Sequence, residues 1–380
     1  MRSTSFLIFF GIVLLIYGTV NYYLFARGLQ AFSLSPLIRK WYIAIFWIIA
    51  PTFIVGSIME RTATSALSEW VYRIGSFWLA YMLYLFMAVV LIDLIRTLNY
   101  FFHFLPPFTP LMKLQTGIIT FSIVTLVVVG GHINALWTNV RIIPLTIHKQ
   151  VTGHPDIKIL MASDIHLGAL IGESREKRLL DIIREQKPDL VLLCGDLVDG
   201  EIAPVLRKNL GNHIQDIKTP LGVYAITGNH EFIGGIRNTL PYLRSINIHM
   251  LLDTAIVLPN GIQLVGRLDR SAGRGTVGPK PLADLMAGLD PSKPVIVMNH
   301  QPYQLDEAVE NKADLHLSGH THHGQMWPFN YITKSMFELS WGLIQKGSTN
   351  LYVSSGFGSW GPPVRIGNRP EVVVFKLRFD

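Results

Sequence analysis

The stretch LSGHTHHGQMWP, residues 317–328, places three histidines within four positions directly after a short apolar run. Histidines this dense are seldom needed for core packing, and the imidazole ring is the commonest metal ligand in proteins. Gly319, just before the first of them, allows a close approach of the backbone. The stretch therefore indicates that these histidines have a functional role at the end of the apolar run.

Four other short apolar runs end in the same way. They are IKILMAS before Asp164, DLVLLCG before Asp196, GVYAITG before Asn229, and PVIVMN before His300. Amphipathic segments such as residues 175–187 lie between the runs, and this alternation predicts an α/β layered fold. Ligands of such folds gather at the carboxyl ends of the strands, so one shared site explains the pattern. The strand-rich end of the chain predicts a second sheet packed on the first.

Read in order, these strand ends give Asp164-x-His166, Gly195-Asp196, Gly228-Asn229-His230-Glu231, His300 and Gly319-His320-x-His322. The ordered set resembles the calcineurin-like metallophosphoesterase superfamily, and phrases such as GDLVDG resemble its membrane-associated bacterial branch. The resemblance implies a sandwich of two β-sheets flanked by helices, and it reaches over residues 157–377.

The resemblance also implies two divalent metal ions and names their ligands. Asp196 would bridge the two ions; the other ligands would be Asp164, His166 and His322 for one ion, and Asn229, His300 and His320 for the other. If residues 320–322 are extended, His320 and His322 share a face and can each reach one ion. Mixed nitrogen and oxygen ligands suit manganese, iron, zinc or cobalt. Two such ions neutralise a phosphoryl group and lower the pKa of an attacking water.

The histidine of the third block has a different implied role. By resemblance, His230 is the catalytic general acid that polarises the phosphate and protonates the leaving oxygen, which suits a pKa near neutral. Glu231 is expected to orient His230. Neither residue is expected to bind metal.

Three further residues are candidate substrate contacts. Arg270 and Arg365 lie in glycine-containing loops, and an arginine fork matches phosphate geometry; solvated loop arginines are the alternative. His323 should face away from the metals if the segment is extended, so it either touches substrate or packs. The aromatic segment 326–341 is expected to be a lid, a membrane-facing lip or a packed connection.

The first third of the chain is of another kind. Only eight of the 33 lysines and arginines and three of the 26 aspartates and glutamates lie before residue 141. Four charge-poor stretches approach or exceed the ~20 residues that a membrane helix needs: Ser5–Phe25, Trp41–Ile58, Ile74–Ile92 and a segment within Leu114–Val140. Because further spans follow the first, a cleaved signal peptide is the poorer explanation. The spans are expected to form an anchor, with a lipid-binding cleft as the alternative; transport lacks the usual signals.

The charge distribution also bears on location. The formal charge of +7 comes largely from residues beside apolar segments, which suits a lipid surface and not a nucleic-acid groove, so no nucleic acid is expected. Basic residues flanking the spans tie between the two faces. The amino terminus and Lys158 favour a cytoplasmic catalytic domain in a bacterial plasma membrane. The single cysteine, Cys194, excludes an internal disulfide.

We therefore expect a transmembrane helical anchor over residues 1–140, a linker over 141–155 and a metallophosphoesterase domain over 156–380. The expected function is a membrane-anchored dinuclear-metal phosphohydrolase that cleaves a phosphoester or pyrophosphate bond of a phosphorylated small molecule or lipid, with the bilayer as its other partner. One alternative is a phosphodiesterase acting on a soluble substrate such as a cyclic nucleotide. The other is a non-catalytic membrane receptor or scaffold, which would normally have lost a ligand or the acid.

Overall fold

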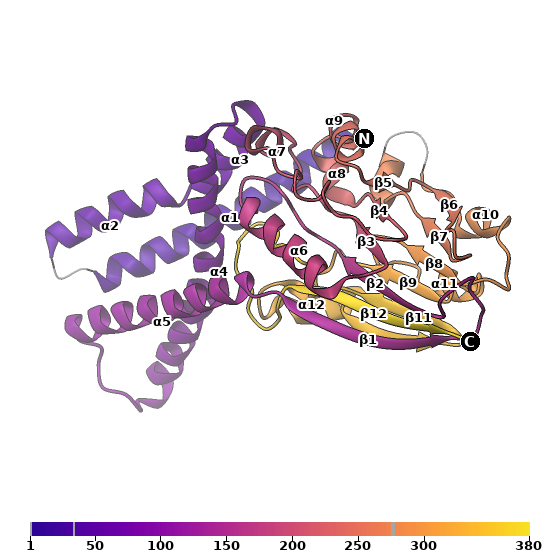
Figure 1. Ribbon diagram of the computed structural model, residues 1–380. Coiled ribbons are helices and arrows are strands. Elements are labelled where there is room, and N and C mark those ends of the chain that lie inside the picture. Colours follow the sequence, from indigo (N-terminus) through magenta and orange to yellow (C-terminus); the bar gives the residue numbers. More distant parts are fainter. Residues whose placement is uncertain (1, 33–34, 275–277) are drawn as a thin grey trace. The chain divides into compact units, whose positions relative to one another are not determined.

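The computed structural model describes residues 2–32, 35–274 and 278–380. Its contacts divide the chain into two compact units, Met1–Gly131 and His132–Asp380, here called the N-terminal unit and the C-terminal unit (Figure 1).

The N-terminal unit is helical, and its helices are α1 (Arg2–Ala31), α2 (Pro36–Ile49), α3 (Thr52–Thr62), α4 (Ala66–Phe102) and α5 (Pro110–Leu136). Together α2 and α3 make one apolar passage that is interrupted at Pro51, which has no N–H to continue the helix. By length and composition four passages can cross a membrane, which confirms the prediction of four spans. The last passage ends at Leu136, and the chain then enters a strand.

The C-terminal unit contains two six-stranded mixed sheets. The first has the order β1-β12-β2-β3-β4-β5, and β2 to β5 run parallel. Its strands are β1 (Asn139–Ile147), β2 (Asp156–Ala162), β3 (Leu190–Cys194), β4 (Val223–Ile226), β5 (His249–Met250) and β12 (Glu371–Phe379). The second sheet has the order β10-β11-β9-β8-β7-β6. Its strands are β6 (Thr254–Val257), β7 (Gln263–Gly266), β8 (Val295–Met298), β9 (Leu315–Ser318), β10 (Gly342–Lys346) and β11 (Thr349–Val353).

The period of two along the strands builds three core layers. On β2, Ile159 and Met161 point between the two sheets, where Leu315 and Leu317 of β9 also lie. Leu160 and Ala162 point to the opposite face, where they pack on the apolar stripe of α6 (Glu173–Gln186). The other face of the second sheet packs on two short helices. The predicted sandwich of two sheets flanked by helices is therefore confirmed.

The remaining helices are short. They are α7 (Ala203–Lys208), α8 (Asn229–Ile233), α9 (Ile236–Ser245), α10 (Leu282–Met286), α11 (Asp306–Glu310), α12 (Phe329–Met336) and the 3₁₀ turns η1 (Arg270–Arg274) and η2 (His322–Gly324).

The segment expected to be a linker, residues 141–155, contains most of strand β1. All nine residues of β1 pair in parallel with β12, and its inward side chains Ile143 and Ile147 are buried between the sheets. In the sequence, Arg141 ends the last stretch of uncharged, apolar residues. Nothing in the sequence predicts that the residues after it pair with the last strand, β12. Residues 141–147 therefore belong to the folded C-terminal unit.

Candidate active site

The candidate site lies where five parallel strands end. β2 leads into Asp164 and His166, β3 into Asp196, β4 into Asn229 and His230, β8 into His300, and β9 into His320 and His322. Several of these side chains sit on left-handed backbone: Asp164, His166, Asp196, His320 and His322 all have φ between 46° and 73°. Non-glycine residues seldom adopt this conformation, and where they do they cluster at functional sites. The turns aim all these side chains into one space.

One group consists of Asp164, His166 and His322, whose ligand atoms lie within 4.8 Å of one another. The Nε2 atoms of His166 and His322 are 3.1 Å apart, and His322 Nε2 is 3.5 Å from the Asp164 carboxylate. Both Asp164 oxygens also accept from the backbone N–H of His320, which fixes the carboxylate. Two imidazole nitrogens directed at each other beside a carboxylate are the arrangement that a shared cation stabilises.

The second group consists of Asp196, His300 and His320; His166 also belongs to a further candidate group, with Asp199 and His230. His300 Nε2 lies 3.0 Å from Asp196 Oδ2, while its Nδ1 is 2.8 Å from the carbonyl oxygen of Cys194. The same Asp196 oxygen is 3.9 Å from His166 Nε2 of the first group. Burial disfavours the Asp196 carboxylate, but the charge of His300 outweighs burial and holds its pKa well below the usual value. Asp196 thus stands between the two groups.

Asn229, the remaining expected ligand, directly precedes His230, whose backbone N–H donates to Asp196. The Oδ1 atom of Asn229 is buried and, among the residues that the structure describes, has no hydrogen-bond partner. A buried acceptor of this kind normally has a partner, and a cation would supply one. The donors therefore fit divalent metal ions, with carboxylate, amide and imidazole atoms converging.

Two glycines make the convergence possible. A Cβ atom on Gly319 would come within 2.3 Å of Asp164 Oδ2, and one on Gly228 within 2.1 Å of Asp196 Oδ1. Any side chain at either position would displace the carboxylate. The close approach expected at Gly319 is what the structure shows.

The motif histidines His320 and His322 do not lie in an extended segment. His320 has φ of 73°, and His322 begins the turn η2. The structure still assigns one histidine to each group, but through left-handed turns and not through the alternation of a strand. The extended-segment explanation was therefore wrong, because the glycine-flanked sequence turns immediately after β9.

His230 points at the edge of the first group, with its ring centre 4.6 Å from that of His166. Its Nδ1 lies 3.1 Å from Asp199, and its backbone N–H donates to Asp196. Burial lowers the pKa of His230, but the hydrogen bond to Asp199 and the nearby carboxylate charges outweigh burial and raise the pKa to about 9. The imidazole is therefore protonated near neutral pH, as a proton donor must be.

Glu231 has a different task from the one expected. Its carboxylate accepts from the backbone N–H groups of Asp196, Leu197, Val198 and Gly228. It therefore fixes the turn that carries Asp196 and does not touch the His230 ring. Asp199 is the residue that orients His230, and it was not among the residues predicted from the sequence. Its signal was the second aspartate of GDLVDG, three positions after Asp196.

Arg365, expected as a substrate contact, is fully buried. Its guanidinium donates to the carbonyl oxygens of Ser355, Gly356 and Gly358, and its Nη2 lies 3.0 Å from His322 Nδ1. Arg365 contacts the Nδ1 atom of His322, whereas the Nε2 atom of that ring faces His166 and Asp164. The expectation of a substrate contact is therefore corrected. The loop residues give no sequence signal for this burial, because a glycine-rich loop usually leaves arginine in solvent.

The other two candidate substrate contacts take different positions. His323 is 8% exposed, its Nδ1 lies 3.1 Å from Ser340 Oγ, and its ring packs on Trp341. It therefore packs behind the site. Arg270 is exposed and stacks on the ring of Tyr303, which packs on Phe337. Since Phe337 in turn meets the ring of His320, Arg270 lies at the rim of the site.

Comparison with known proteins agrees with this geometry. Residues 157–324 match the family model described as calcineurin-like phosphoesterase. A metallophosphoesterase of Campylobacter jejuni is 31% identical over 98% of this chain and 99% of its own length. One of Aquifex aeolicus is 31% identical over 65% of this chain and 95% of its own length. A bovine transmembrane protein with metallophosphoesterase domain is 30% identical over 67% of this chain and 61% of its own.

The family uses divalent metals to hydrolyse phosphoesters, and the bovine relative is named as a transmembrane protein. Three observations lead to one assignment. They are the carboxylates and histidines at the strand ends, the match of residues 157–324 to the family model, and the relative that matches over nearly its full length. The chain is a membrane protein that belongs to the calcineurin-like metallophosphoesterases, which are metal-dependent phosphoester hydrolases.

Proposed function

We propose that this protein is a membrane-anchored phosphohydrolase with a dinuclear metal centre, and that it cleaves a phosphoester or pyrophosphate bond of a lipid-linked substrate. The proposal rests on two features of the chain. The C-terminal unit has two groups of carboxylate and histidine side chains that would each suit a cation, and apolar side chains lie near that site.

The metal ligands divide as the two groups divide. Asp164, His166 and His322 would hold one ion, and Asn229, His300 and His320 the other, with Asp196 shared. When bound, two divalent ions neutralise phosphoryl oxygens and make an attacking water more acidic. Manganese, iron, zinc and cobalt all suit this donor set.

The chain's own residues supply the proton. His230 carries a proton near neutral pH and is not a member of the two proposed ligand sets. It would donate that proton to the leaving oxygen as the phosphorus–oxygen bond breaks. Asp199 holds the ring through Nδ1, which leaves Nε2 as the atom that donates. Asp199 is thus a positioning residue for the acid.

The observation that favours a lipid-linked substrate is the surface around the site. Helix α12 begins five residues after η2 ends and has no buried residue along its length. Its Tyr331, Ile332 and Met336 are exposed, with Ile332 at 51%. On the His230 side, Trp360 is 57% exposed, with its ring centre 6.2 Å from that of His230. Amphipathic helices with such a face lie at lipid interfaces.

Arg270 is the residue that we propose contacts the anionic part of the substrate. Its guanidinium stands over the Tyr303 ring at 4.2 Å, exposed at the rim beyond His320. Stacking holds the planar fork in place, and two parallel N–H donors match a phosphate.

We further propose that the protein resides in a bacterial plasma membrane with the C-terminal unit in the cytoplasm. Two of the relatives named above are bacterial, and the amino terminus and Lys158 favour the cytoplasmic side. A C-terminal reporter that is active only in the cytoplasm should give signal, whereas one active only outside the membrane should not.

The substrate class is tested with the metal-loaded, full-length protein. Turnover of phosphatidic acid and an isoprenoid pyrophosphate in vesicles is compared with turnover of soluble cyclic nucleotides and bis-p-nitrophenyl phosphate. We expect the vesicle substrates to be preferred. Preference for a cyclic nucleotide would favour the soluble phosphodiesterase instead. No turnover of any substrate at full metal occupancy would favour a receptor.

A pair of variants on α12 sharpens the test. Ile332→Glu places a carboxylate on the apolar face, and Ser335→Glu places one on an exposed polar position of the same helix. Ile332→Glu should lower the ratio of vesicle turnover to soluble turnover about five-fold, since burying its apolar surface is worth ~1–2 kcal/mol. Ser335→Glu should leave the ratio near that of the wild type. Equal ratios in the two variants would contradict a role for this face.

A further inference from the structure

The N-terminal unit contains a cavity of about 270 Å³ that the phosphohydrolase site does not use. Residues of α1, α2, α4 and α5 line it, together with Phe108. Most of the lining is apolar, including Leu24, Phe46, Trp78, Leu85, Val89 and Phe121. The volume is near the lower end of ligand pockets, which begin at ~300 Å³, so it suits a segment of one hydrocarbon chain better than a bulky ligand.

One wall of the cavity is held rigidly. Tyr42 of α2 packs so closely against α1 that a Cβ atom on Gly28 would overlap its hydroxyl group. The Tyr42 hydroxyl donates to the carbonyl oxygens of Leu24 and Phe25, and its ring stacks on Phe25. The cavity is therefore a shaped space and not a gap between loosely packed helices.

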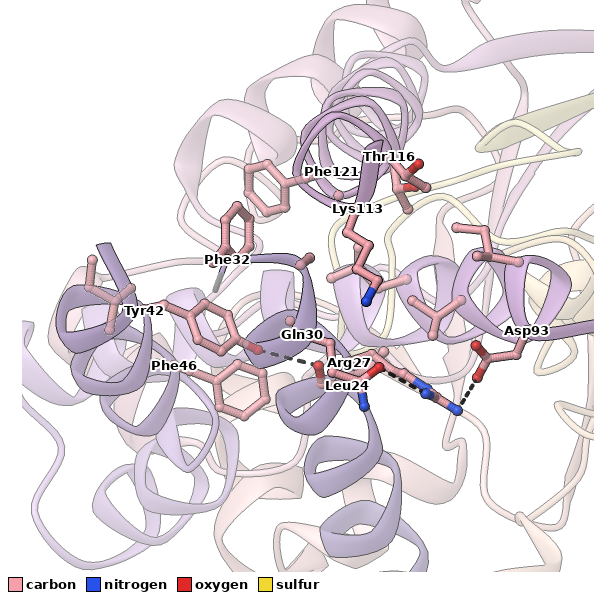
Figure 2. A pocket seen from close by; sticks show the side chains of 18 of the residues that line it. Leu24, Arg27, Gln30, Phe32, Tyr42, Phe46, Asp93, Lys113, Thr116 and Phe121 are labelled. Carbon is pink, nitrogen blue, oxygen red and sulfur yellow. Dashed lines mark hydrogen bonds and ion pairs between the residues drawn. The ribbon is translucent and has the colours of Figure 1, made fainter. Parts of the chain in front are cut away.

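Charged side chains gather at one part of the lining. Arg27 of α1, Asp93 and Arg96 of α4, and Lys113 of α5 all line the cavity, although they lie far apart in the sequence (Figure 2). Three cations face one carboxylate, which leaves an excess of two positive charges. Ionisable groups within membrane spans are costly and normally mark a functional site.

Both oxygens of the single carboxylate, that of Asp93, already have partners. Asp93 Oδ2 lies 2.7 Å from Arg27 and accepts from the Tyr23 hydroxyl, while Oδ1 lies 3.6 Å from Arg96. Among the residues that the structure describes, the Lys113 ammonium has no hydrogen-bond or ion-pair partner. Figure 2 shows its side chain extending from α5 towards Arg27 and Gln30. The cluster is therefore short of an anion beside an apolar space.

We propose that this cavity binds an anionic phospholipid of the bilayer. The phosphate of the headgroup would lie against Lys113, Arg96 and Arg27, and the first part of one acyl chain would fill the apolar space. A phosphate supplies the negative charge that Asp93 alone does not balance, and Arg and Lys are the usual phosphate ligands. The site goes beyond the proposed hydrolysis, since a lipid can be held here whether or not it is ever a substrate.

The experiment uses the full-length protein in nanodiscs that contain equal amounts of phosphatidylglycerol and phosphatidylcholine. Native mass spectrometry of the released protein identifies which lipid stays bound. We expect one phosphatidylglycerol to be retained in preference to phosphatidylcholine. Equal retention of the two lipids, or retention of neither, would overturn the proposal.

Paired variants test the two parts of the site separately. Lys113→Gln removes a charge and keeps the space, whereas Thr120→Phe keeps all charges and fills part of the space. Each should lower the preference for phosphatidylglycerol, Lys113→Gln by about five-fold, the effect of one basic residue near an anionic lipid. The matched control is Lys40→Gln, which removes an exposed charge from α2 that does not line the cavity. It should keep the wild-type preference.

These variants also guard against unfolding and surface attraction. Each is first shown to elute as the wild type does on size exclusion, and a variant that fails is replaced by Lys113→Met or Thr120→Leu. If Lys40→Gln lowers the preference as much as Lys113→Gln, the attraction belongs to the whole charged surface and the proposed site is wrong. If Thr120→Phe leaves the preference unchanged, the lipid does not enter the cavity and the proposal is equally overturned.

Discussion

Each unit of this protein gathers ionisable side chains into a cluster of its own. The two clusters have opposite balances of positive and negative charge. The C-terminal unit surrounds its site with the buried carboxylates of Asp164 and Asp196, the partly buried carboxylate of Asp199 and several histidine rings, and such a set attracts cations. The N-terminal unit places three cations around the single carboxylate of Asp93, and that set attracts an anion. Each cluster is incomplete by itself, and the sign of what is missing indicates the ligand.

The two clusters also differ in how the backbone presents them. Groups of the C-terminal site stand on tight turns after strands, several of them left-handed. Those of the N-terminal cavity stand on regular helices, so no unusual backbone is needed. Strained turns are held in one conformation by the structure around them, and bond-breaking chemistry requires such fixed positions. Helical positions with long, flexible side chains suit the reversible binding of a lipid headgroup.

The largest effect is expected at the centre of the C-terminal site. Asp196→Asn should abolish turnover of bis-p-nitrophenyl phosphate, because Asp196 lies between both groups of proposed ligands and its charge would help to hold both proposed ions. Elemental analysis should show metal content falling for both ions together. The loss of affinity should exceed the ~100-fold that supporting residues contribute at most.

The matched control for that variant is Asp216→Asn, which removes an exposed carboxylate of the same unit. It should keep both activity and metal content. If Asp196→Asn lost one ion and kept the other fully occupied, Asp196 would belong to one group only, and the bridging assignment would be wrong.

The acid should give the next largest effect. His230→Ala should lower the turnover rate by ~10²–10⁴, the usual contribution of a general acid, and leave metal content close to that of the wild type. The split between rate and metal content separates His230 from the ligands. A metal-free His230→Ala protein would show that His230 binds metal instead.

The sequence predicted the C-terminal unit well, because its chemistry follows ordered motifs at strand ends. The two-sheet fold and the four spans are confirmed, and six of the seven expected ligands lie close together in two groups. What could not be predicted was the direction of each side chain. Glu231 is next to His230 in sequence but bonds to backbone N–H groups, whereas Asp199 reaches the ring from another turn. Neighbours in sequence after a tight turn point in different directions.

The burial of Arg365 and the pairing of β1 could not be predicted from the sequence for a related reason. β1 pairs with β12, a segment more than 200 positions away. Arg365 is held by the carbonyl oxygens of a folded loop and by His322, and these contacts form only in the tertiary structure. The charged cavity was missed because its residues come from three helices with no shared motif. Its composition alone suggested at most a cleft between helices.

The boundary between the two units gives a third prediction. A chain that starts at residue 132 should fold and turn over soluble substrate, whereas one that starts at residue 148 lacks β1. The shorter chain loses the burial of Ile143 and Ile147, so its free energy of unfolding should fall by about 3–6 kcal/mol. Urea unfolding of the two chains, followed by circular dichroism, measures the difference. Equal stability would show that β1 is a dispensable part of the anchor.

The smallest effect is expected at Asp199, which contacts the Nδ1 atom of the proposed acid, His230. Its hydrogen bond and charge help to raise the pKa of His230 to about 9, so His230 is protonated below that pH and loses its proton as the pH rises through it. Asp199→Asn keeps an oxygen for the ring and removes the charge, so the pKa should fall. The alkaline limb of the profile of kcat against pH should therefore move to lower pH, with about a ten-fold loss of rate at pH 9 and a smaller loss at neutral pH. Because Asp199 also lies 3.3 Å from His166, metal content is measured in parallel. A uniform loss of rate at every pH, with the limb unmoved, would mean that Asp199 serves the metal ligands and not the acid.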